Sequence, residues 1–148
     1  MKCVILSVGK EKDGIFDEAI SHFSTRLLRY VPLEWVYLEH RETKEKEAQD
    51  ILGKIKKEDY VVLLDEKGSL MKSEELAGLI EHRMVDGVRR VVFIIGGAHG
   101  VTTDIVERAN YVWKLSSLVF PHMLVRAILA EQLYRAMTIL KGEKYHHV

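Results

Sequence analysis

A run of β-forming residues ends in a glycine-rich break in the stretch Arg90-Val91-Val92-Phe93-Ile94-Ile95-Gly96-Gly97-Ala98-His99-Gly100. A short helical pattern follows from Thr102. A strand that ends in glycines before a helix is a place where small ligands dock on α/β sheets. Glycine also lets a ligand approach the backbone without a Cβ in the way. The stretch therefore predicts a strand of an α/β fold with a binding loop at its end.

Strand and helix patterns alternate on both sides of this stretch. Strands are expected at residues 2–8, 33–38, 60–65, 90–95 and 111–115, and helices at 13–28, 43–57, 73–85, 102–109 and 122–140. Ser73 is the expected N-cap of the third helix. The alternation predicts an α/β fold with a mainly parallel sheet and helices on both faces. We expect a single domain over residues 1–148, because this length is typical of one domain.

The overall charge argues against one class of function. The chain has 22 basic and 22 acidic residues, so its formal net charge is zero. A neutral protein does not bind nucleic acid by bulk electrostatics, although a local basic face remains possible. From Tyr111 onward there are five basic residues and only two acidic ones. This basic C-terminal segment suits phosphate contact at one place.

The single cysteine, Cys3, lies in the apolar run Cys3-Val4-Ile5-Leu6. It predicts a buried free thiol in a reducing compartment. The apolar run after Lys2 is too short for a signal peptide, and no apolar run approaches the length of a membrane span. We therefore expect a cytoplasmic protein that has no membrane partner.

Several familiar sites do not match the sequence. The glycine break lacks the dinucleotide fingerprint, because Ala98 and Val101 occupy positions that require glycine. A response-regulator site, with Asp65 as phosphate acceptor and Lys114 as its lysine, lacks an acidic pair after the first strand. The histidines show no pair at metal-ligand spacing beyond the adjacent His146-His147, so no metal site is expected. A nucleophile elbow is also missing.

The last helix pattern, residues 122–140, is apolar nearly all round. A helix with this pattern must be buried on most sides, whereas a terminal helix of a small α/β domain covers only one face of the sheet. We therefore expect a dimer through this helix, with Leu129 and Met137 at the seam.

Five motifs together resemble a known family. They are the strand and loop Phe93–Gly100, the loop Leu115–Phe120, Pro121-His122 with Arg126, Glu131-Gln132-Leu133-Tyr134-Arg135-Ala136, and the tail Gly142-Glu143-Lys144-Tyr145-His146-His147. In this order and spacing the chain resembles the bacterial large-subunit (23S) rRNA pseudouridine methyltransferase H family, of the SPOUT class. His99 departs from the pattern, since an acidic or amide side chain is more usual at this position.

The resemblance implies a parallel sheet whose C-terminal segment is threaded through a loop as a trefoil knot. It also implies a homodimer that uses S-adenosylmethionine to methylate nitrogen-3 of a pseudouridine in the 23S rRNA of assembled ribosomes. The cofactor-binding residues expected from it are Leu64, Gly96, Leu115, Ser116, Ser117, Leu118, Val119 and Phe120. The expected catalytic residues are His122, Arg126, Arg135, Tyr145 and His146.

Parts of this expectation follow from the residues themselves. Loops that follow parallel strands meet at one edge of a sheet, so those after residues 64, 95 and 115 can form one pocket. His122 and Arg126 are one helical turn apart. Glu131 and Arg135 have the same spacing, which also fits a plain helix ion pair. The tail predicts either a cover over the partner subunit's site or a disordered end.

Two other functions stay open from the sequence. One is a SPOUT methyltransferase that acts on transfer RNA, since the same cofactor loops would serve it. The other is a dimeric α/β adaptor without catalysis. Cofactor binding distinguishes the adaptor from the enzymes, and the RNA that becomes methylated distinguishes the two enzymes.

Overall fold

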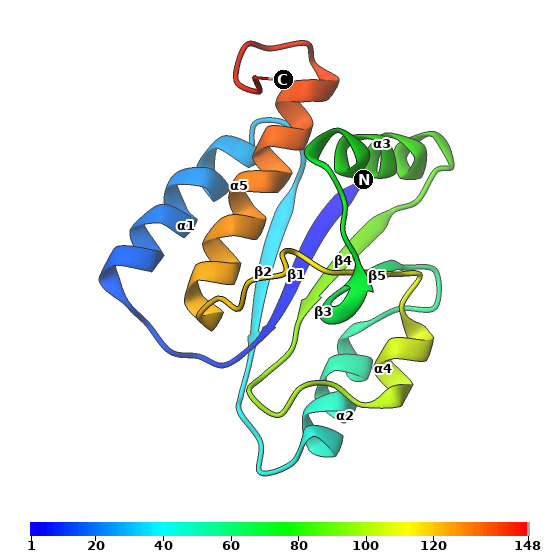
Figure 1. Cartoon of the computed structure of the whole chain (residues 1–148). Coiled ribbons are helices and arrows are strands. Elements are labelled where there is room, and N and C mark those ends of the chain that lie inside the picture. The colour runs from blue at the N-terminus through cyan, green and yellow to red at the C-terminus, as the bar shows by residue number, and fades with distance from the viewer. Residues whose placement is uncertain (148) are drawn as a thin grey trace.

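The structure is a computed structural model that describes residues 1–147. Five strands and five helices alternate along the chain (Figure 1). The strands are β1 (Lys2–Val8), β2 (Leu33–Leu38), β3 (Tyr60–Ser69), β4 (Arg90–Ile95) and β5 (Tyr111–Trp113). The helices are α1 (Gly14–Leu27), α2 (Lys44–Lys54), α3 (Ser73–Val85), α4 (Thr103–Arg108) and α5 (His122–Leu140).

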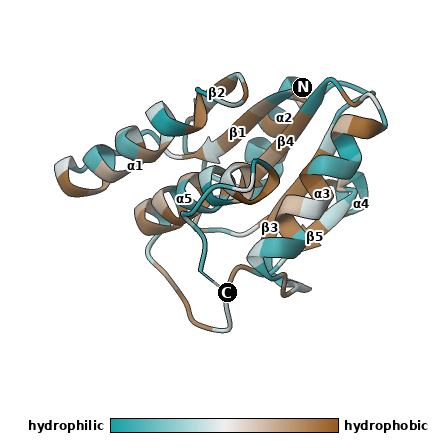
Figure 2. Cartoon of the chain, turned by 90° about the horizontal axis from the view of Figure 1, so that it is seen from above, coloured by the Kyte–Doolittle hydropathy of each residue, from teal (hydrophilic) through white to brown (hydrophobic). Residues whose placement is uncertain are grey.

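The strands form one sheet in the order β2-β1-β4-β3-β5, and every described pairing is parallel. Helices α1, α3 and α5 contribute to the apolar core on one face, and α2 and α4 to the core on the other. In the view from above, strand β1 is largely hydrophobic along its length (Figure 2). The predicted α/β fold, with its mainly parallel sheet and helices on both faces, is confirmed.

Strand β1 shows why its sequence is almost continuously apolar. Cys3 and Ile5 pack into the core on the α1/α5 side, whereas Val4, Leu6 and Val8 pack into the core on the α2/α4 side. Successive strand side chains point to opposite faces, so a strand covered on both sides needs apolar residues at every position. Burial raises the pKa of the Cys3 thiol to about 12, as befits a cysteine in the core.

Several boundaries differ from the predictions: β5 ends at Trp113 rather than residue 115, and α2 ends at Lys54 rather than residue 57. Strand β3 continues to Ser69 rather than ending at residue 65, because its polar end pairs with β5 after a shift of register. Helix α3 begins at Ser73, so the N-cap is Lys72 and the predicted Ser73 cap is wrong. The Ser73 hydroxyl instead donates a hydrogen bond to Gln132 Oε1 of α5, 2.7 Å away.

Helix α5 is the longest of the five helices described. Its 19 residues span about 28 Å. Its first turn lies at the edge where the strands end, and its last turn leads to the tail at the opposite end (Figure 1). Within residues 1–147 no helix has the length and apolar character of a membrane span.

The predicted seam residues of α5 lie inside a single chain. Leu129 and Met137 are only 0% and 3% exposed, because they pack between α1, α3 and the sheet. The expectation that these two side chains face a partner is therefore wrong. The half-buried stripe that α5 leaves open consists of Leu124, Ile128, Glu131, Arg135 and Ile139. The knot and the dimer stay predictions.

Candidate functional site

A cavity of about 740 Å³ lies at the edge of the sheet where the strands end. It is lined by residues of β3, the end of β4, the start of α5 and the segments that follow β1, β2, β4 and β5. These residues are Glu11, His40, Leu64, Asp65, Glu66, Ile95, Gly96, Gly97, Ala98, His99, Gly100, Val101, Lys114, Leu115, Ser116, Leu118, Val119, Phe120, His122 and Val125. A volume of this size suits a nucleoside-sized ligand.

The structure brings the expected cofactor-binding residues together around this cavity. Leu64, Gly96, Leu115, Ser116, Leu118, Val119 and Phe120 all line it, whereas Ser117 does not. Leu118 and Val119 are 72% and 93% exposed, so two large apolar side chains stand at the rim of the cavity. The Ser116 hydroxyl accepts a hydrogen bond from the Leu118 N–H at 3.0 Å, which turns the loop toward that rim.

The glycine break forms one wall of the cavity. Gly100 has a φ of +79°, which favours glycine, and its N–H donates to the Gly97 carbonyl at 3.1 Å. A Cβ at Gly96 would lie 2.7 Å from Val101 Cγ1, and Val101 itself lines the cavity. Any side chain at position 96 must therefore displace the Val101 side chain, which forms part of this wall.

His122 lies at the start of α5 and is half-buried beside the cavity. Its Nε2 lies 3.1 Å from Arg126 Nη2 and 3.3 Å from Ser7 Oγ. Since a guanidinium only donates, Nε2 accepts this hydrogen bond and the imidazole proton belongs on Nδ1. Burial and the nearby Arg126 charge lower the pKa of His122 below its ordinary value of 6.5, so the ring is neutral near pH 7.

Arg126 is almost completely buried, at 1% exposure, and does not line the cavity. It donates from Nε to Ser7 Oγ and from Nη2 to the Gly9 carbonyl, both at 2.7 Å. Its guanidinium carbon lies 4.9 Å from the centre of the Tyr37 ring, a cation–π distance. These contacts connect α5 to the ends of β1 and β2. The Arg126 guanidinium also contacts the His122 ring and so fixes its orientation.

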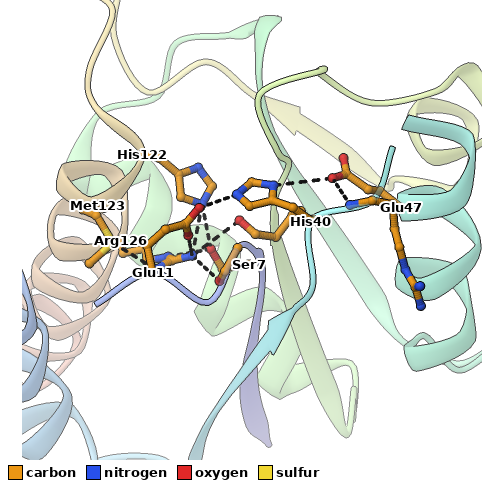
Figure 3. A network of polar contacts seen from close by, with 10 residues as sticks. Ser7, Glu11, His40, Glu47, His122, Met123 and Arg126 are labelled. Atoms are coloured by element: carbon orange, nitrogen blue, oxygen red, sulfur yellow. Dashed lines mark hydrogen bonds and ion pairs between the residues drawn. The ribbon is translucent and has the colours of Figure 1, made fainter. Parts of the chain in front are cut away.

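His40 lies between two carboxylates at the side of the cavity (Figure 3). Its Nε2 contacts Glu11 Oε1, and its Nδ1 lies 3.6 Å from Glu47 Oε2. Glu47 is 2% exposed and accepts a hydrogen bond from the Arg41 N–H at 3.1 Å. Glu11 Oε2 lies 3.9 Å from Arg126 Nη2, so Glu11 provides negative charge near the buried guanidinium.

The remaining expected catalytic residues lie at the other end of α5. Arg135 Nη1 contacts His146 Nδ1 at 3.1 Å, and the Tyr145 hydroxyl donates to Glu131 Oε1 at 3.2 Å. The Tyr145 ring also packs edge-on against Tyr134, with ring centres 4.7 Å apart. These contacts order the tail against its own helix. Within one chain, the structure therefore separates Arg135, Tyr145 and His146 from the cavity.

The sequence predictions did not include Glu11, His40 or Glu47. The rule that loops after parallel strands meet at one edge applies to β1 and β2 as well, and it points to Glu11 and His40. No short motif reveals Glu47, whose role depends on the packing of α2. Within residues 1–147 no three His, Cys, Asp or Glu side chains are grouped as a metal ion requires.

A comparison with protein-family models gives one match over nearly the whole chain. The matching model carries the description "Predicted SPOUT methyltransferase" and covers residues 1–146.

Proposed function

Because the chain belongs to the SPOUT methyltransferase family, we propose that it transfers a methyl group from S-adenosylmethionine to RNA. The target we propose is nitrogen-3 of a pseudouridine in the 23S rRNA of assembled ribosomes. The resemblance of the five motifs supports this finer assignment. Because ribosomes are the proposed substrate, the proposal also locates the protein in the cytoplasm.

The cavity is the observation that carries the proposal. Its size suits a nucleoside-sized ligand, and the absence of a Cβ at Gly96 makes room for Val101, which packs there as part of the cavity wall. Leu64, Leu115 and Leu118 offer apolar walls for an adenine ring, and main-chain groups of the same loops offer hydrogen bonds to its edge. The residues present therefore fit S-adenosylmethionine.

When bound, S-adenosylmethionine supplies an activated methyl group on a sulfonium centre. The loops Gly96–Gly100 and Leu115–Phe120 would hold the donor, and this matters because an in-line displacement depends mainly on positioning. His122 stands beside the cavity as a neutral imidazole, and its Nδ1–H would donate to an oxygen of the donor or the substrate. Arg126 fixes this ring from behind.

We further propose that the site is completed by a second subunit. Arg135, Tyr145 and His146 form one cluster at the far end of α5. Two copies packed antiparallel along the stripe Leu124–Ile139 would bring this cluster beside the partner's cavity. The basic residues of the C-terminal segment, doubled in such a dimer, would then contact RNA phosphates on both sides of the site.

A methylation assay with labelled donor tests the function. Ribosomes from cells that lack the enzyme should accept about one methyl group each, at a pseudouridine of 23S rRNA. Ribosomes from cells that contain the enzyme are the matched control and should accept almost none. Methylation of transfer RNA instead would support the alternative SPOUT enzyme. A protein that binds neither the donor nor its demethylated product would support the adaptor.

A further inference from the structure

The cavity has two chemically different halves. Strand β3 and the loops after β4 and β5 contribute its apolar and main-chain walls, including Leu64, Gly96 and Leu118. The segments after β1 and β2 contribute Glu11 and His40. In the sheet order β2-β1-β4-β3-β5, the two halves are neighbours on either side of the glycine break after β4. A ligand that fills the cavity therefore needs an apolar part and a charged part.

The carboxylate of Glu11 is held in a fixed place in the charged half. His40 binds its Oε1, and Arg126 Nη2 lies 3.9 Å from its Oε2. The Glu11 backbone N–H and the contact with His40 lower the pKa of this carboxyl group, so it is ionised at neutral pH. Glu11 is 52% exposed, so it remains accessible from the cavity while its orientation is fixed.

Two glycines make room for this arrangement. A Cβ at Gly9 would collide with the Glu11 carboxylate and lie 2.9 Å from His40 Nε2, and the φ of Gly9 is +111°. A Cβ at Gly97 would lie 2.9 Å from Oε1 of Glu47, the buried carboxylate on the other side of His40. Glu11, His40 and Glu47 thus form a row in which the histidine lies between two carboxylates. The row fits because Gly9 has no side chain beside Glu11 and Gly97 has none beside Glu47.

The cavity lining carries more negative than positive charge, and the buried Arg126 guanidinium next to Glu11 does not line it. Glu11, Asp65 and Glu66 line it with negative charge, against one positive residue, Lys114. Asp65 accepts a hydrogen bond from the Lys67 N–H within its own turn, and both Asp65 and Glu66 lie beside the apolar half. Glu11 is thus the carboxylate of the polar half, next to the neutral His122.

We propose that Glu11, positioned by His40, binds the α-ammonium group of the methyl donor. S-adenosylmethionine has the same two-part character as the cavity, with an adenosine at one end and a zwitterionic amino acid at the other. With adenosine against β3 and the loop after β5, the amino acid would extend past the glycine break toward Glu11. This inference rests on the proposed function and assigns a ligand group to a residue that the family motifs do not include.

Binding of three ligands to Glu11→Gln tests the assignment by calorimetry. S-adenosylmethionine and S-adenosylhomocysteine both carry the ammonium group, and their affinities should fall about tenfold or more, as for loss of a charge-assisted hydrogen bond. 5′-Methylthioadenosine lacks the amino acid, and its affinity should not change. Glu39→Gln is the matched control, because Glu39 precedes His40, pairs with Lys10 at 3.5 Å and does not line the cavity.

Substitution of His40 separates positioning from binding. His40→Gln retains an amide donor for Glu11 and should keep most of the affinity for S-adenosylmethionine. His40→Leu removes the hydrogen-bond donor to Glu11. As in Glu11→Gln, the affinities for S-adenosylmethionine and S-adenosylhomocysteine should fall, and the affinity for 5′-methylthioadenosine should not change. Because His40 is 45% exposed, both variants should fold, which circular dichroism checks.

Two results would overturn the inference while leaving the proposed function intact. In the first, all three ligands lose affinity equally in Glu11→Gln. In the second, none of them loses affinity. If methyl transfer falls in this second case, Glu11 is a group that acts on the RNA. A wild-type protein that binds none of the three ligands would remove the proposed function and the inference together.

Discussion

Arg126 Nη2 donates a hydrogen bond across one turn of α5 to Nε2 of His122, 3.1 Å away. The same guanidinium donates to Ser7 Oγ and to the Gly9 carbonyl on β1 and the loop after it. One buried cation therefore fixes the ring at the cavity and the end of the neighbouring strand. The role of Arg126 that the structure supports is to position His122 rather than to touch the substrate.

Replacement of Arg126 by Leu should lower the free energy of unfolding by about 2–4 kcal/mol, because several buried acceptors lose their donor. Urea unfolding followed by circular dichroism measures this change. Arg29→Leu is the control, since Arg29 lies exposed after α1 and its loss should cost less than about 0.5 kcal/mol. Equal stabilities of the two variants would contradict the buried role of Arg126.

The lowered pKa of His122 predicts a pH dependence of stability. Below its ordinary pKa of 6.5, the unfolded chain binds a proton that the folded ring does not yet accept, because burial and Arg126 disfavour the charge. The free energy of unfolding should therefore fall as the pH decreases from about 6.5 toward the folded pKa. Glu11 opposes this shift only partly. Urea titrations between pH 5 and 8 should show a flatter profile for His122→Gln.

Gly96→Val should weaken binding of S-adenosylmethionine by more than about tenfold, because its side chain must push Val101 into the cavity. Calorimetry with the folded variant measures the affinity. Gly53→Val is a matched control, since Gly53 is exposed on α2 and a Cβ there meets nothing within 4 Å. Unchanged affinity in a folded Gly96→Val protein would remove the pocket assignment.

Ile128→Glu should convert the proposed dimer to a monomer, because Ile128 lies in the half-buried stripe of α5 and a charge there disrupts an apolar seam. Light scattering after size exclusion at micromolar concentration gives the mass. Ile15→Glu makes the same change at a side chain that is 81% exposed on α1 and should leave the dimer intact. A wild-type monomer in this measurement would end the dimer proposal.

The tail is best tested in mixed dimers. Deletion of residues 144–148 should leave donor binding nearly unchanged but greatly reduce methyl transfer, because Tyr145 and His146 are lost. A heterodimer of this subunit with a Gly96→Val subunit should regain activity. Its intact cavity then meets the tail of the other chain. An inactive heterodimer would place the tail's action within its own subunit, and full activity of the tail-deleted homodimer would show that the tail is dispensable.

The parts of the fold that were predictable are those with continuous local patterns. Strand β4 and helix α5 matched their expected bounds, since their apolar residues signal both type and extent. The end of β3 was not predictable in this way. Residues 65–69 are polar, and they join the sheet only through backbone pairing with β5 after a register shift.

The candidate site was predictable only in part, for a similar reason. The cofactor loops follow strand ends and carry recognisable motifs. In contrast, the contacts of Arg126 with Ser7 and Tyr37 join residues far apart in sequence. The separation of His122 from Arg135 was predictable, since 13 residues of helix cover about 20 Å, and it excludes one site built from both in a single chain.

The glycines beside His40 have a consequence for how this chain can vary among related proteins. Positions 9 and 97 face the carboxylates of Glu11 and Glu47 at distances that leave no room for a Cβ. A relative with a side chain at position 9 must therefore move the ends of the side chains at 11 and 40, place smaller residues there, or route the loop after its first strand differently. In a set of such sequences, residues 9, 11 and 40 should change together, and so should residues 47 and 97. The charged side chains at this edge of the cavity would then be conserved or replaced together in related proteins, rather than one at a time.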